Sequence, residues 1–83
     1  MSDEIQSVIE VLEELATDST VPKSVRAKIS VSLQTLKNPA QDVSMRINKV
    51  QDELEEITGD SNLPNYVRTQ LMNISGMLEF VQN

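Results

Sequence analysis

The sequence predicts an all-α protein: an up-and-down, left-handed four-helix bundle built from two repeated helical hairpins. Residues 5–36 and 47–78 align 42 positions apart and are identical at 11 of 32 positions, which is typical of one supersecondary unit used twice. Apolar residues recur at helical spacing, and the period-two pattern of strands is missing. The segments between the expected helices are short, which favours antiparallel neighbours.

The first half of the chain reads as helix, loop and helix. An apolar stripe with a spacing of three and four residues marks each expected helix, and a mean spacing of 3.5 favours packing at about +20°. The first stripe is Ile5, Val8, Leu12 and Leu15, and the second is Val25, Ile29 and Leu36, with Ser32 as a polar gap.

The second half repeats this plan. Its stripes are Ile47, Val50, Leu54 and Ile57, extended backward to Val43, and then Val67, Leu71, Ile74, Leu78 and Val81. The chain is therefore expected to form one domain over residues 1–83, with the first hairpin at about 3–38 and the second at about 40–81.

Proline and capping residues separate the expected helices. Pro22 and Pro64 are expected in the first turn of the helix after each hairpin loop, where a missing N–H costs little. Gly59 is expected to cap the end of the third helix. Between the hairpins, residues 38–41 are expected to end one helix and to start the next, with Pro39 at its first position.

Each hairpin loop carries an aspartate followed eight residues later by an arginine, Asp18 with Arg26 and Asp60 with Arg68. One interpretation is a structural clasp, in which each arginine reaches back across the loop to a carboxylate in a bidentate fork. The other makes Arg26 and Arg68 contacts for an anion or a partner. Repetition at matching loop positions favours the clasp, to which Pro22 and Pro64 also belong.

Composition and charge narrow the classes of function. The net charge of −6 repels a phosphate backbone, so no nucleic-acid partner is expected. No apolar run approaches the ~20 residues that cross a bilayer, and the start of the chain lacks the basic and apolar regions of a signal peptide, so we expect no membrane partner and a cytoplasmic location. Cysteine and histidine are absent, which leaves serine without its usual activating partners.

No catalytic, cofactor-binding or metal-binding residue is therefore assigned, and the chain is not expected to be an enzyme. Two alternatives stay open. A divalent-metal-binding protein or an enzyme would use the duplicated carboxylates Glu13, Glu14, Glu55, Glu56, Asp18 and Asp60. A nucleic-acid accessory protein would use the basic second helix, with Lys23, Arg26, Lys28 and Lys37.

More apolar residues are present than the stripes need. Four of them form a candidate interface: Phe80, Met77, Tyr66 and Met72. They serve either the core or a protein partner, and a homodimer is one form that such an interface takes. Gly76, inside the last helix, either allows another helix to approach or fits a crowded crossing within the chain, and the second reading is preferred. The sequence thus favours a non-catalytic protein-interaction or scaffold module that self-associates.

Two resemblances follow from these residues. The order Leu12, Leu15, Asp18, Val25-Arg26, Ile29 and Leu33 resembles a HEAT-type helical repeat, which implies a protein-binding scaffold. More closely, the chain resembles an uncharacterised family of small, acidic archaeal proteins. That likeness spans about residues 3–81 and rests on the Leu-Glu-Glu-Leu and Leu-Glu-Glu-Ile segments and the two Asp-to-Arg loops. It implies a four-helix bundle and an archaeal cytoplasmic source, and it implies no activity.

Overall fold

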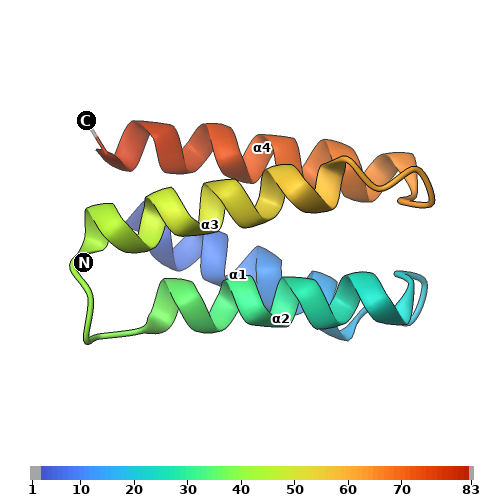
Figure 1. Ribbon diagram of the computed structural model, residues 1–83, viewed down its shortest axis with the longest axis horizontal. Coiled ribbons are helices and arrows are strands. Elements are labelled where there is room, and N and C mark those ends of the chain that lie inside the picture. The colour runs from blue at the N-terminus through green and yellow to red at the C-terminus, as the bar shows by residue number, and fades with distance from the viewer. Residues whose placement is uncertain (1–2, 83) are drawn as a thin grey trace.

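The protein folds as four α-helices joined by short loops. The computed structural model describes residues 3–82, with side chains described for residues 4–81. The helices are α1 (Asp3–Thr17), α2 (Lys23–Lys37), α3 (Val43–Thr58) and α4 (Asn65–Gln82), as Figure 1 shows. The predicted all-α fold class is confirmed.

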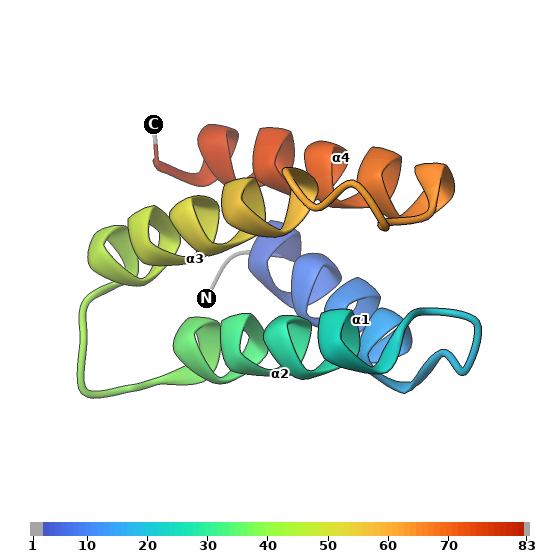
Figure 2. The same cartoon turned by 45° about the vertical axis from the view of Figure 1, so that its right-hand side comes forward.

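The helices form an up-and-down bundle. Each packs against two neighbours in a closed ring, because α1 contacts α2 and α4 while α3 contacts α2 and α4. Figures 1 and 2 show the α1–α2 and α3–α4 loops at one end of the bundle. The α2–α3 loop, the start of α1 and the end of α4 lie at the other end. Loops this short require consecutive helices to run antiparallel to each other.

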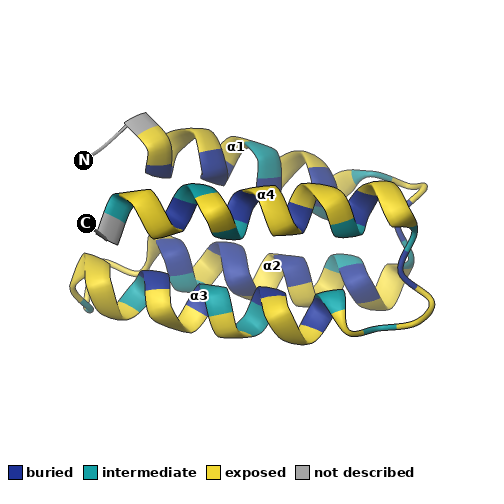
Figure 3. Cartoon of the chain, turned by 90° about the horizontal axis from the view of Figure 1, so that it is seen from above, coloured by how far each residue is buried: buried dark blue, intermediate teal, exposed yellow. Residues whose placement is uncertain are grey.

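The predicted stripes form the core. In Figure 3 the buried residues recur along the inner side of each helix, separated by exposed ones. The stripe residues are buried, with two exceptions: Val43 is 38% exposed and Val81 is half-buried. The backward extension of the third stripe to Val43 is therefore wrong, because this residue is the first of α3, directly after the loop, and its side chain stays exposed.

The loops and the flanks of the stripes add to this core. Val21 and Leu63, each just before the proline of a hairpin loop, are 1% and 4% exposed and seal the same end of the bundle. Ile9 and Leu33 widen the stripes of α1 and α2. Part of the apolar surplus is thus accounted for by burial within one chain.

Ser32 is the polar member of the core. It is fully buried at the place where the second hairpin carries Ile74, and its Oγ has no hydrogen-bond partner. A buried hydroxyl without a partner costs about 1–3 kcal/mol. The core of the first hairpin is therefore less well satisfied than that of the second.

Candidate functional site

All three corners of the bundle share one loop geometry. Each loop has at or next to its start an Asp or Asn whose Oδ1 accepts a hydrogen bond from the backbone N–H two residues later, an Asx turn. The acceptors are Asp18, Asn38 and Asp60, and the N···O distances are 2.9, 3.0 and 2.9 Å. The α2–α3 connection therefore turns as the two hairpin loops do, although it lies outside the sequence repeat.

The residue before each following helix acts as its N-cap. Pro22 precedes Lys23, the first residue of α2, and its carbonyl accepts from the Arg26 amide at 2.9 Å. Pro64 has the same place before α4. The prediction that both prolines lie in the first turn is thus wrong by one residue, because an N-cap needs no amide of its own in the helix.

The predicted start of α3 is also too early. Pro39 lies in the loop, and Asp42 caps the helix by accepting from the Met45 amide at 3.0 Å. Gly59 does cap the end of α3, as predicted, but with helical dihedral angles (φ −78°, ψ −8°) in place of the left-handed ones that favour glycine.

An arginine occupies the fourth position of each helix that follows a loop. Arg68 donates from Nε to the Thr58 carbonyl (3.2 Å) and from Nη2 to the Asp60 carbonyl (2.9 Å), so that one side chain closes the α3–α4 loop. Arg46 donates from Nη1 to the Leu36 carbonyl at 2.9 Å, across the α2–α3 loop. These contacts place a cation on the free carbonyls that end α3 and α2, where it is favourable.

The predicted carboxylate clasp is therefore wrong in its chemistry. Arg68 binds the backbone oxygen of Asp60, and its third contact goes to Asn65 Oδ1 at 3.0 Å. The Asp60 carboxylate is occupied by its own Asx turn. In the first loop Arg26 Nε is buried and has no hydrogen-bond partner, so the two hairpins are not held in the same way.

The Asp18 carboxylate lies in a hydrogen-bonded loop. Hydrogen bonds from the Thr20 hydroxyl (2.7 Å) and the Thr20 amide (2.9 Å), with a smaller effect of the Arg26 charge, lower the pKa of Asp18 from its ordinary value. The Thr20 hydroxyl also shares a hydrogen bond with the Tyr66 hydroxyl, at the start of α4. Because the Thr20 hydroxyl donates its only hydrogen to Asp18, the Tyr66 hydroxyl is the donor in this second bond.

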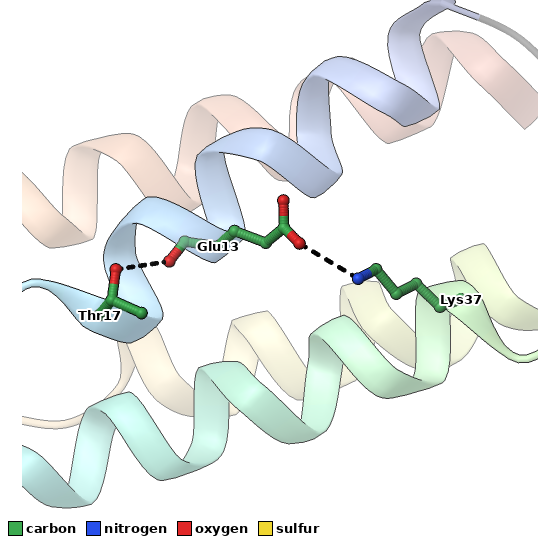
Figure 4. A network of polar contacts seen from close by, with 3 residues as sticks. All are labelled: Glu13, Thr17 and Lys37. Carbon is green, nitrogen blue, oxygen red and sulfur yellow. Dashed lines mark hydrogen bonds and ion pairs between the residues drawn. The ribbon is translucent and has the colours of Figure 1, made fainter.

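The duplicated acidic pairs do not come together. Glu13 Oε2 pairs with Lys37 Nζ at 3.2 Å on the surface, while Thr17 Oγ1 bonds the Glu13 carbonyl (Figure 4). Glu55 and Glu56 are exposed on α3. Over the residues that the structure describes, no three acidic side chains meet in a group that could hold a metal ion. The described helices also include none that is long and apolar enough to cross a membrane.

The four residues of the candidate interface divide into two pairs. Met77 is half-buried and packs against the core, and Tyr66, 47% exposed, is tied to the first loop through Thr20. Met72 and Phe80 are 61% and 81% exposed. Phe80 is the most exposed large apolar side chain described, and it has a Met two helical turns before it on the same face.

The outer face of α4 is almost free of charge. The helix has 18 residues, of which two are charged, Arg68 and Glu79. Arg68 closes the loop, and Glu79 accepts a hydrogen bond from Gln51 on α3 at 2.9 Å. Both charges are thus directed to the α3 side. We call five of the remaining exposed residues, which lie along one side of the helix, the α4 face: Thr69, Met72, Asn73, Gly76 and Phe80.

Gly76 lies in the middle of this face. A Cβ atom built on it meets no atom within 4 Å, so the preferred reading, a crowded crossing within the chain, is wrong. Beside it runs a groove of about 370 Å³ between α3 and α4, with Leu54 and Leu71 among its lining residues. Met72, Gly76 and Glu79 line the same groove on the α4 side.

The comparisons with known proteins agree with the fold. A model of the Uncharacterised protein family (UPF0147) matches residues 1–81. The chain belongs to this family. No curated protein matches it. The family membership confirms the resemblance on which the sequence was assigned to an uncharacterised group of all-helical proteins.

Two solved structures resemble this UPF0147 chain over nearly its whole length. The unknown-function protein MMP1188, from Methanococcus, is 32% identical, with a TM-score of 0.92, and the match covers 98% of this chain and 92% of that one. A UPF0147 protein from Thermoplasma acidophilum is 34% identical, with a TM-score of 0.88 and coverage of 93% and 91%. Both are archaeal and of unknown function, so the family supplies a fold and no activity.

Sequence reasoning missed Arg46 and the role of Gln51, whose Nε2 bridges Glu79 and the Ser75 carbonyl (3.1 Å). A signal for Arg46 was present, since Asn38 precedes it by the same eight residues that separate Asp18 from Arg26. The 42-residue repeat does not reveal it, because the α2–α3 loop belongs to neither hairpin. Nothing in the sequence distinguishes Gln51 from other surface amides.

Proposed function

We propose that this protein is a non-catalytic interaction module that self-associates through the α4 face. The observation that carries the proposal is the exposure of Phe80 and Met72 on the α4 face, whose own five residues are uncharged. Exposed apolar residues gathered on one face are typical of protein contact sites, whereas scattered ones need no explanation. Met and aromatic side chains are also enriched at such contacts.

The other exposed apolar residues support this choice by contrast. Val31 on α2 is 57% exposed but shares its surface with Lys28, Glu53 and Glu56. Met45 on α3 is 56% exposed and has Lys49 one helical turn further on. Charged residues are depleted from the centres of protein interfaces. Met72 also has Glu55 and Glu79 in its groove, but it shares its helix face with Phe80, whereas the structure describes no second exposed large apolar residue on the helix face of Val31 or of Met45.

We further propose a cytoplasmic location and no nucleic-acid partner. Small secreted domains depend on disulfides, and this chain of 83 residues has no cysteine. The net charge of −6 opposes binding to phosphate backbones. In the basic helix α2, Lys37 already pairs with Glu13.

Native mass by light scattering over a concentration series tests the proposal. The wild type should form a dimer that Phe80→Glu converts to a folded monomer. Val31→Glu is the matched control, since it adds the same charge at another exposed apolar position, and it should leave the dimer intact. A wild type that stays monomeric at every concentration refutes self-association, and equal loss in both variants refutes the assignment to α4.

A further inference from the structure

We infer that two copies of this chain pack with their α4 helices antiparallel, on a two-fold axis that passes beside Gly76. The inference rests on the proposed self-association and specifies its geometry. In this arrangement Gly76 faces Gly76 of the second copy, and Met72 faces Phe80 of the second copy.

The symmetry of the α4 face carries the first step. A two-fold interface is self-complementary, so residues at equal distances before and after the axis meet each other. Met72 lies four residues before Gly76 and Phe80 four residues after it. The two most exposed apolar side chains of α4 are thus placed symmetrically about its glycine, and an antiparallel pair matches each methionine with a ring.

Gly76 itself carries the second step. A glycine inside a helix is unfavourable relative to alanine, and here no neighbour within the chain requires it, since an added Cβ meets nothing within 4 Å. An absent side chain allows the backbone of another helix to come close, as small residues do at helix crossings. The position is explained if the close neighbour is a second chain.

Charge selects a second copy as the occupant. Two molecules that each carry a net charge of −6 repel each other unless they meet where charge is absent. The α4 face comes nearest to that condition, because Thr69, Asn73 and Gly76 between and beside the apolar residues are neutral, and the acids at its margin, Glu55 and Glu79, lie in the groove toward α3. An acidic patch meeting its own copy elsewhere on the bundle would bring like charges together.

The groove beside Met72 gives the second copy's ring a place. Phe80 of the second copy approaches at the level of Met72, and the groove of about 370 Å³ between α3 and α4 opens there. The buried Leu54 and Leu71 and the exposed Met72 line it together with Glu55, Thr58, Ser75 and Glu79, so the ring meets both apolar and acidic side chains there. By symmetry the same contact forms twice.

The size of this face sets the expected strength. An aromatic side chain buries roughly 150–250 Å². The two rings therefore supply less than half of the roughly 1,200 Å² at which stable interfaces begin. We expect a transient dimer that dissociates on dilution.

Single-cysteine cross-linking tests the geometry, because the natural chain has no cysteine. A mixture of Met72→Cys and Phe80→Cys proteins should give several-fold more disulfide-linked dimer than either variant alone, under mild oxidation at the concentration where the wild type is dimeric. Val31→Cys is the control for random collision. Self-linking of Met72→Cys above the mixed product would show parallel helices and overturn the inference.

Gly76→Ala supplies a second readout. The added methyl group fits the folded chain, so thermal unfolding should shift to higher temperature while the dimer dissociates at higher concentration than the wild type. An unchanged or tighter dimer would overturn the close approach. A wild-type dimer without mixed cross-links refutes this geometry and leaves the proposed function standing, whereas a monomeric wild type refutes both.

Discussion

Replacing the guanidinium group of Arg68 should destabilise the fold. The same replacement at Arg26 should have a much smaller effect. Arg68→Met keeps an apolar stem and deletes three hydrogen bonds of 2.9–3.2 Å, two of them to the carbonyls of Thr58 and Asp60. At Arg26, the matching position of the repeat, Nε has no partner to lose. The two variants are thus a matched pair within one molecule.

The magnitude follows from the contacts of each side chain. A hydrogen bond from a charged donor contributes about 1.5–3 kcal/mol. Arg68 is only half-buried and water can reach the freed carbonyls, so we expect a total loss of about 2 kcal/mol, close to the value of one such bond rather than of three. For Arg26→Met we expect a change of less than about 0.5 kcal/mol, because the loss of the attraction to Asp18 is offset by removal of a buried Nε that has no partner. In a domain of this size, 2 kcal/mol lowers the melting temperature by roughly 10 °C.

Urea unfolding followed by circular dichroism measures both losses. The m-values should be unchanged, so that a shift of the midpoint reports stability alone. Arg46→Met, which removes the 2.9 Å bond to the Leu36 carbonyl, should fall between the other two. If Arg26→Met costs as much as Arg68→Met, the carbonyl contacts are not the source of the stability and the interpretation of the corners is refuted.

Three further predictions concern single positions. Ser32→Ala should raise the free energy of unfolding by about 1 kcal/mol because it removes a buried hydroxyl without a partner, and a loss of stability in urea would show that the hydroxyl is satisfied. Asp18→Asn removes the charge of Asp18 but should keep its Asx turn, because Asn38 makes the same turn in the α2–α3 loop. Because folding lowers the pKa of Asp18, the wild type should have an advantage above the unfolded pKa of about 3.9 that disappears as the pH falls further, and a constant difference between wild type and variant would contradict this. Lys37→Met should change stability by less than about 1 kcal/mol, since the pair with Glu13 is exposed, and a larger effect that persists in high salt would contradict that reading.

The helices and the core were predictable because burial repeats along the chain. Each stripe places apolar residues three or four positions apart, and this spacing puts them on one side of a helix. The buried residues Leu12, Leu54 and Leu71 belong to such stripes, so the stripe alone identifies the inner face. The burial of Val43 was predicted wrongly, because a stripe does not show where the neighbouring helices end. The predicted helix starts at Pro22 and Pro64 are wrong by one residue for a related reason. Proline is compatible with both the N-cap and the first turn, and only the observed start of the helix distinguishes the two positions.

The arginine contacts were predictable in place and not in chemistry. The sequence shows that Arg68 follows a loop, and a carboxylate nearby is an obvious partner. It does not show the free carbonyls at the end of α3, which exist only once the helix ends at Thr58. The role of Gly76 was unpredictable for a similar reason. The sequence does not show whether another part of the chain or open space lies beside this residue.

Two-dimensional ¹H–¹⁵N NMR spectra over a dilution series test the role of the α4 face most directly. The backbone amides of Thr69, Met72, Asn73, Gly76 and Phe80 should shift together as the protein is diluted, while those around Val31 and Met45 stay fixed. Spectra that do not change with concentration, or changes centred on α2 and α3, would contradict the assignment of the contact surface to α4.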